Sequence, residues 1–180
     1  NMAASADTFP KILLENVQKF GSSKAAIRET DYGIWQSYTW QDYHDYVKAF
    51  ALGLASLGFK RGDKLAIIGD NRPQLYFGMA AAQSLGGVPV PLYQDAIEKE
   101  LEFILEHSEA KFALAEDQEQ SDKLLSLKDR IPNIEYIIYN DPKGMRNYTE
   151  EFLMAFEHVE GLGRKFGDEN PNYFEDEISK

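Results

Sequence analysis

Between residues 62 and 139 short apolar runs alternate with longer segments of helical spacing, and this alternation most constrains the fold. A short, continuous apolar run is typical of a strand that helices cover on both faces. Strands that alternate with helices over short connections predict an open, mostly parallel α/β sheet with helices on both faces. We expect strands at Leu65–Gly69, Val88–Leu92, Phe112–Ala115 and Glu135–Tyr139.

The second of these strands contains Pro89 and Pro91, which have no backbone N–H to donate to a neighbouring strand. Such a strand is expected at the edge of the sheet, or hydrogen-bonded on one side only. Gly86 and Gly87 precede it, and we expect them to end a helix and to let that helix pack closely on the sheet.

The turn that follows this strand is the candidate ligand-binding position. It lies at the carboxyl end of a parallel strand, where ligands usually bind in open α/β sheets. We therefore predict Tyr93 and Gln94 as ligand contacts, the alternative being an ordinary loop. Asp70 and Asn71 also follow a strand, but we interpret them as caps of the next helix, with Asn71 as the N-cap.

Before residue 62 the pattern predicts a helix, a β-hairpin and a second helix. Apolar residues recur at helical spacing from Phe9 to Phe20, and two strand-like runs follow, Ala25–Arg28 and Ile34–Tyr38. Gly33 is the expected turn residue between these runs. Thr39–Asp42 (T-W-Q-D) resembles a capping box, with Asp in place of the usual Glu, and opens the second helix.

The chain is expected to hold one folded unit, an α/β subdomain over residues 8–160. We interpret residues 1–7, in which an Asn precedes the Met, as a disordered tag remnant. Beyond Tyr139 the pattern indicates only one short helix around Phe156. Residues 161–180 are rich in Gly, Asn, Pro and acidic side chains, which predicts an exposed tail or linker.

Composition limits the partners. The formal net charge of −11 disfavours nucleic-acid binding, because an acidic chain repels phosphate backbones. The sequence contains no cysteine, which excludes disulfides and thiol chemistry and fits a reducing cytosol. No apolar run of about twenty residues occurs, so we expect no transmembrane segment. We expect a cytoplasmic protein and leave open a peripheral membrane contact.

Motifs that bind nucleotides or activate a nucleophile are absent. The sequence contains neither G-x-G-x-x-G, nor G-x-x-x-x-G-K-[ST], nor G-x-S-x-G. We therefore expect this chain to contribute no catalytic and no metal-binding residue of its own. The histidines and serines interpreted as ordinary structural residues are His44, His107, His158, Ser84, Ser108 and Ser121.

Four short motifs follow one another between Tyr38 and Tyr93: Y-T-W, G-x-x-x-G-D, N-x-P and G-x-V-x-V-P-L-Y. In this order they resemble the amino-terminal region of the adenylate-forming enzymes, such as acyl-CoA synthetases, luciferases and peptide-synthetase adenylation domains. The segment Ser108–Tyr148, with E-D-Q-E-Q before a Leu-rich helix and a D-P-x-G turn, resembles the long-chain fatty acid–CoA ligases in particular. The resemblance covers residues 8–148.

The resemblance implies a two-step reaction. ATP and a fatty acid give an acyl-adenylate and pyrophosphate, with Mg²⁺ neutralising the phosphates, and the thiol of coenzyme A then displaces AMP. The family's phosphate loop, of the form T-S-G-T-T-G-x-P-K, is absent from the sequence. We expect the chain to stop just before that loop and to be inactive by itself.

The resemblance also implies a surface site for the nucleotide part of coenzyme A. In some relatives the turn after the P-L-Y strand contacts it, which assigns this contact to Tyr93 and Gln94. The next βα connection, near Glu116 and Asp117, is a second such position, although two carboxylates there would repel phosphates.

Two alternatives to a long-chain ligase stay open. In the first, the chain is a non-catalytic α/β binding or interaction module. In the second, it is part of a ligase for another carboxylate, such as a medium-chain, aryl or amino acid. A complete enzyme would cover this sheet with a second subdomain. The isolated chain is therefore expected to expose apolar surface and to self-associate.

Overall fold

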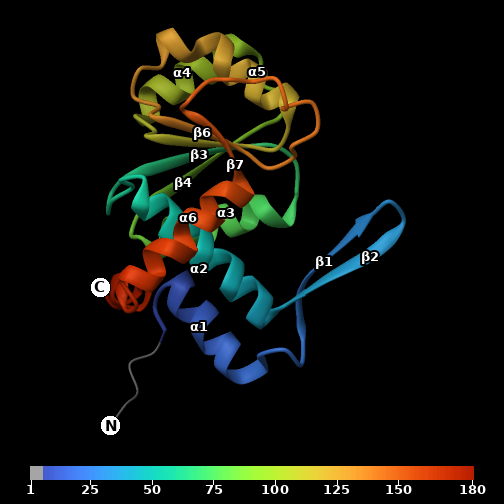
Figure 1. Cartoon of the computed structure of the whole chain (residues 1–180), viewed down its shortest axis with the longest axis vertical. Coiled ribbons are helices and arrows are strands. Elements are labelled where there is room, and N and C mark those ends of the chain that lie inside the picture. Colours follow the sequence, from blue (N-terminus) through green and yellow to red (C-terminus); the bar gives the residue numbers. More distant parts are fainter. Residues whose placement is uncertain (1–5) are drawn as a thin grey trace.

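The computed structural model describes residues 6–180, so most of the segment interpreted as a tag lies outside the described residues. Five parallel strands form one sheet in the order β4-β3-β5-β6-β7 (Figure 1), which confirms the expected α/β fold. The sequence pattern does not indicate β7, which is only three residues long. The strands are β3 (Lys64–Ile68), β4 (Val88–Leu92), β5 (Phe112–Ala115), β6 (Tyr136–Tyr139) and β7 (Leu153–Ala155).

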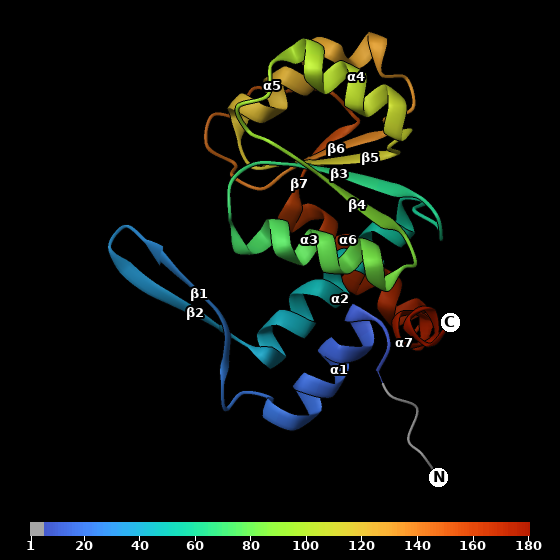
Figure 2. The ribbon, with the colours of Figure 1, turned by 180° about the vertical axis from the view of Figure 1, so that it is seen from behind.

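Helices cover both faces of the sheet (Figures 1 and 2). One face carries α4 (Glu98–Ser108) and α5 (Gln118–Leu127), the latter followed by a 3-10 turn, η1 (Lys128–Arg130). The other face carries α2 (Trp40–Ser56), α3 (Pro73–Ser84) and α6 (Phe156–Glu169), with α1 (Phe9–Phe20) and α7 (Tyr173–Ser179) packed beneath them.

Alternation along β3 explains the two cores, because successive side chains of a strand point to opposite faces. Leu65 and Ile67 join the core under α2 and α3, whereas Ala66 and Ile68 join the core under α4 and α5. A strand covered on both faces is apolar at every position, which is why β3 and β5 are recognisable in the sequence.

β4 lies at the edge of the sheet, as its prolines predict. The N–H of Val88 donates to the carbonyl of Asp63 at 2.9 Å. Because alternate residues of a strand bond to the same neighbour, the backbone nitrogens of Pro89 and Pro91 point to the free edge of the sheet. That edge presents carbonyls but no N–H groups from these two residues, so it is a poor template for another strand.

The expected hairpin and capping box are both present. β1 (Ala25–Asp31) and β2 (Ile34–Thr39) pair antiparallel around Tyr32 and Gly33, whose φ angles of 49° and 76° are typical of a two-residue hairpin turn. The Thr39 hydroxyl accepts from the Asp42 N–H at 3.1 Å, and the Asp42 carboxylate accepts from the Thr39 N–H at 2.9 Å. The hairpin projects from the body of the molecule (Figure 1).

The expectation of an exposed tail or linker over residues 161–180 is wrong. These residues continue α6 and form α7, so the folded unit extends past residue 160. Gly53 of α2 and Gly163 of α6 let the two helix backbones touch, because a Cβ at either position would collide with the main chain of the other helix. Phe174 of α7 is buried. A segment rich in glycine can be a loop or a helix that packs closely on a neighbour, and composition does not distinguish the two, which explains the error.

Candidate functional site

The carboxyl ends of β3, β5 and β6 open into a polar hollow of about 570 Å³. The next two strands of the sheet along the chain, β4 and β5, lie on opposite sides of β3. Such a topological switch point is where ligands bind in open α/β sheets. The polar hollow is lined by Glu29, Asp31, Tyr32, Gln36, Tyr38, Arg72, Gln74, Glu116, Asp117, Asn140, Asp141 and Pro142.

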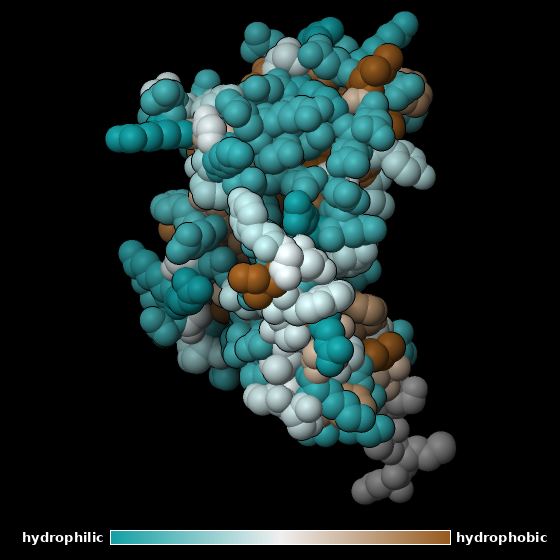
Figure 3. Space-filling model, turned by 90° about the vertical axis from the view of Figure 1, so that its right-hand side faces the viewer, coloured by the Kyte–Doolittle hydropathy of each residue, from teal (hydrophilic) through white to brown (hydrophobic). Residues whose placement is uncertain are grey.

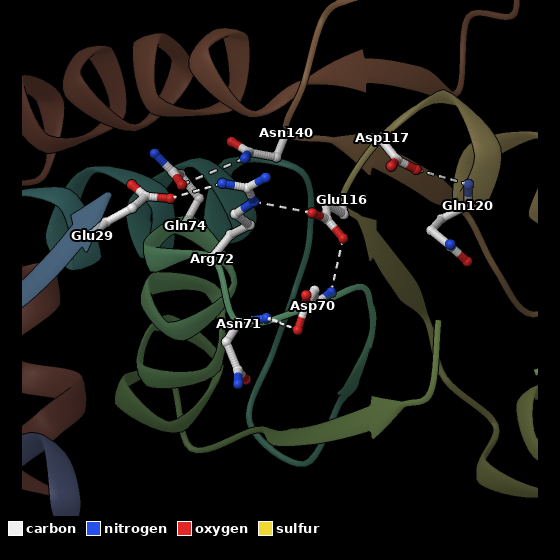
Figure 4. A network of polar contacts seen from close by, with 9 residues as sticks. All are labelled: Glu29, Asp70, Asn71, Arg72, Gln74, Glu116, Asp117, Gln120 and Asn140. Carbon is white, nitrogen blue, oxygen red and sulfur yellow. Dashed lines mark hydrogen bonds and ion pairs between the residues drawn. The ribbon is translucent and has the colours of Figure 1, made fainter. Parts of the chain in front are cut away.

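Arg72 joins three parts of the chain in this hollow (Figure 4). Its Nε donates to Glu116, after β5, at 3.1 Å, and its Nη1 donates to Glu29, on β1, at 3.2 Å. The bonds to Glu116 and then Glu29 raise the pKa of the Arg72 guanidinium. The second oxygen of Glu116 accepts from the Asp70 N–H at 2.8 Å. Arg72 therefore holds the projecting hairpin against the carboxyl edge of the sheet.

The expected cap of α3 is not the observed one. The N-cap position is Arg72, and no side chain binds the free N–H groups there. The Asn71 side chain accepts instead from the Tyr76 hydroxyl at 3.0 Å, and the Asp70 carboxylate accepts from the Asn71 N–H at 2.8 Å. Pro73 at the first helical position has no N–H, so one of the groups that a cap would satisfy is missing.

Uncharged polar groups complete the wall of the hollow. The Asn140 amide donates to Gln74 at 3.5 Å. Burial raises the pKa of Tyr38, and the negative charge of Glu29 raises it further. Tyr38 therefore stays protonated at neutral pH and can act as a hydrogen-bond donor.

The polar hollow does not fit phosphate groups. The carboxylates of Glu116 and Glu29 share the single positive charge of Arg72, and Asp117 caps α5 by accepting from the Gln120 N–H at 3.1 Å. Asp31 and Asp141 add further negative charge to the same lining. Acidic side chains outnumber the one guanidinium, so an anionic ligand meets net repulsion. Residues 6–180 also hold no group of three or more side chains arranged to bind a metal ion.

A second hollow, the β4–α4 groove, lies at the sheet edge and differs in chemistry. It measures about 930 Å³ and is lined by Val90, Pro91, Leu92, Tyr93, Asp95, Ala96, Ile97, Lys99, Glu100, Phe103 and Ile104. Tyr93 stands at its rim with 88% of its surface exposed. The Gln94 carbonyl accepts from Lys123 Nζ at 2.6 Å. The two predicted ligand contacts thus lie beside an apolar groove, and Glu116 and Asp117 lie in the polar hollow.

Five of the six side chains interpreted as structural make contacts within their own helices or caps. The hydroxyls of Ser84, Ser108 and Ser121 donate to backbone carbonyls of their own helices or caps, at 2.7, 3.3 and 2.8 Å. His107 stacks on Phe103, and His44 pairs with Asp45 at 3.0 Å. The three serine hydroxyls thus bond to the backbone of their own helices or caps.

The family is identified by comparison with known proteins. The model of the AMP-binding enzyme family matches residues 13–164. The 4-hydroxybutyrate–CoA ligase 2 of Metallosphaera sedula is 34% identical over 133 residues, which cover 74% of this chain and 23% of that protein. The long-chain-fatty-acid–CoA ligase ACSBG2 of Xenopus laevis is 26% identical over 136 residues, which cover 74% of this chain and 18% of that protein.

Solved structures agree on the fold. Coronafacic acid ligase from Pectobacterium brasiliense superposes with a TM-score of 0.74 at 18% identity, over 84% of this chain and 29% of that one. The anthranilate CoA ligase AuaEII, in complex with anthranoyl-AMP, gives 0.73 at 18% identity, over 84% and 27%. The family model, which matches residues 13–164, shows that the chain belongs to the AMP-binding enzyme family, whose members are adenylate-forming enzymes. It spans about a fifth of the curated relatives that it matches.

Sequence reasoning named Glu116 and Asp117 but missed the polar hollow that they line together with Glu29 and Arg72. Arg72 is 43 residues from Glu29 and 44 residues from Glu116 along the chain. No local sequence motif therefore connects the three residues. The available signal was topological, because the carboxyl ends of β3 and β5 must meet once β4 is assigned to the edge.

Proposed function

We propose that this chain is the amino-terminal α/β part of an acid–thiol ligase that makes acyl-CoA. The observation that carries the proposal is the family match over residues 13–164 together with relatives named as CoA ligases. A carboxylate is a poor acceptor for a thiol because oxide is a poor leaving group. Its oxygen therefore attacks the α-phosphorus of ATP and expels pyrophosphate. The coenzyme A thiol then attacks the acyl carbon, and AMP leaves.

The proposed acid is a long-chain fatty acid. The resemblance over Ser108–Tyr148 supports this choice, as do several relatives named as long-chain ligases. A second candidate is a short hydroxy acid, because the relative at 34% identity is named a 4-hydroxybutyrate–CoA ligase.

The chain by itself is proposed to be inactive. Its sequence contains no Ser/Thr/Gly-rich phosphate loop, and its polar hollow repels phosphates. Residues 6–180 also hold no group of three or more His, Cys, Asp or Glu side chains that could bind a metal ion. A non-catalytic module on the same scaffold is the alternative, and a full-length ligase without activity would favour it.

Coenzyme A is proposed to contact Tyr93 and Gln94 through its nucleotide. The β4–α4 groove is mostly apolar, which suits the face of a purine, and the Tyr93 ring at its rim can stack on one. Lys99 lines the same groove and can pair with a phosphate, and it stands beside two carboxylates of the lining, Asp95 and Glu100. The second position, near Glu116 and Asp117, is not proposed, because the polar hollow does not fit phosphates.

A cytoplasmic location is also proposed. No helix in residues 6–180 is long and apolar enough to cross a membrane.

Self-association of the isolated chain is proposed as well. Val88, Ile97 and Phe103 expose large apolar surfaces around β4 and α4. Figure 3 shows that the side from which the hairpin projects is mostly hydrophilic, with scattered apolar residues. The β4–α4 groove is therefore the proposed contact between copies.

The test is acyl-CoA formation, measured by mass spectrometry. The full-length ligase receives ATP, Mg²⁺, coenzyme A and a series of acids from 4-hydroxybutyrate to long-chain fatty acids, and the 180-residue chain is assayed beside it. Long-chain thioesters from the full-length ligase alone would support the proposal. A preference for 4-hydroxybutyrate would favour the second candidate, and turnover by the chain alone would overturn the assigned inactivity.

A further inference from the structure

The turn after β4 presents Tyr93 without burying it. The Ala96 N–H donates to the Tyr93 carbonyl at 3.1 Å, which closes a four-residue turn. The Tyr93 ring is 88% exposed. A ring with so few contacts does not hold its own backbone in place. Its orientation therefore depends on whatever anchors the turn from the inner side.

Helix α5 supplies that anchor. Lys123 Nζ donates to the Gln94 carbonyl at 2.6 Å, and its side chain is only 20% exposed. Hydrogen bonds from charged donors are about twice as strong as neutral ones. The helix itself is well held, because Leu124 and Leu127 are buried and Asp117 caps its first turn. Within residues 6–180 this is the one hydrogen bond that the Gln94 carbonyl accepts.

We propose that Lys123 is a positioning residue for coenzyme A. It holds the turn after β4 so that the Tyr93 ring stands at the rim of the β4–α4 groove, ready to stack on the nucleotide. The inference rests on the proposed contact of coenzyme A with Tyr93 and Gln94. Lys123 acts through the turn, because its Nζ bonds to the Gln94 carbonyl and its side chain is not part of the groove lining.

The test compares Lys123→Met with Lys123→Arg and Glu119→Gln in the full-length ligase. Glu119 lies 3.7 Å from Lys123 on the same helix and does not bond to the turn, so its substitution is a matched control. We expect Lys123→Met to raise KM for coenzyme A about five- to tenfold, as for the loss of one charge-assisted hydrogen bond. The value of kcat and the KM for ATP should not change, and Lys123→Arg should restore most of the loss.

Tyr93→Ala, assayed in the same series, separates this inference from the proposed function. If Tyr93→Ala raises KM for coenzyme A and Lys123→Met does not, the positioning role is wrong and the contact stands. If neither variant raises it, the contact itself is wrong and the positioning role falls with it. A Lys123→Met ligase with a lower Tm and every KM raised would point to a purely structural role and overturn the inference.

A second readout needs no coenzyme. Amide hydrogen exchange at Asp95 and Ala96, measured in the 180-residue chain, should be faster in Lys123→Met than in the parent chain. It should stay unchanged in Glu119→Gln. Equal exchange rates at these amides in all three chains would mean that Lys123 does not anchor the turn.

Discussion

The polar hollow and the β4–α4 groove lie at the same sheet but differ in almost every property. The polar hollow collects carboxylates around Arg72 and is walled by the hairpin. The groove is apolar, lies between the edge strand and α4, and contains Lys99. A parallel sheet thus determines where ligands can bind, whereas the connecting loops and helices decide which ligand is accepted. Of the two, only the groove combines an apolar wall with an exposed aromatic ring, Tyr93, on which a purine can stack.

The largest expected effect concerns Glu160, a carboxylate that lacks the partners found in the polar hollow. Its side chain is buried on α6, its Oε2 has no hydrogen-bond partner within residues 6–180, and Arg164 is 3.8 Å away. Burial raises the pKa of Glu160 from 4.5 to about 7. Between pH 4.5 and about pH 7 the carboxyl of Glu160 is therefore protonated in the folded chain and ionised in the unfolded chain. The free energy of unfolding consequently falls as pH rises through this range.

Glu160→Gln should remove this pH dependence. Relative to the parent chain, the free energy of unfolding of the variant should rise by about 3 kcal/mol between pH 4.5 and pH 8, since each pKa unit corresponds to about 1.4 kcal/mol. Urea denaturation at several pH values measures the difference. Parallel pH profiles for the two chains would contradict a raised pKa of Glu160 in the folded state.

A smaller effect is expected from Arg72→Met in the polar hollow. The substitution leaves Glu29 and Glu116 facing each other without the shared guanidinium. Because Arg72 is about half exposed, solvent screens part of the loss, and we expect destabilisation by about 1–2 kcal/mol in urea. Arg130→Met removes an exposed pair with Glu102 and should cost no more than about 0.5 kcal/mol. Equal losses would mean that the hairpin is not held by Arg72.

The contrast in charge can be tested by adding a carboxylate to each hollow. Tyr93→Asp should raise KM for coenzyme A about tenfold in the full-length ligase, because it removes the stacking ring and repels phosphates. Tyr32→Asp alters a comparably exposed tyrosine at the polar hollow and should leave this KM unchanged. A rise with Tyr32→Asp and none with Tyr93→Asp would place the coenzyme in the polar hollow instead.

The smallest effect should come from the free edge of β4. Replacing Pro89 and Pro91 with valine restores two outward N–H groups. The gain from pairing so short a strand is no more than about 1 kcal/mol, so we expect a modest rise in dimer fraction by sedimentation equilibrium. Pro132→Val, in an exposed loop, is the control. A dimer fraction that does not respond would mean that the prolines do not protect this edge.

Much of the fold could be predicted because its signals are local. Apolar runs identify the strands that are buried on both faces, and the prolines place β4 at the edge. The capping box at Thr39 and the positive φ of Gly33 are also set by residues within one turn. The end of the chain could not be predicted in this way, because Gly163 is needed for close packing on α2, which lies over a hundred residues away along the chain.

The candidate site divides along the same line. By itself the sequence determined the family, the parallel sheet and the position of Tyr93 and Gln94 after an edge strand, because these depend on residue types at short spacing. Only the tertiary structure brought Glu29 and Glu116 to Arg72, packed α6 and α7 against α2, and set Lys123 against the Gln94 carbonyl. Such contacts join residues that are distant along the chain, and their geometry exists only once the sheet has ordered its strands.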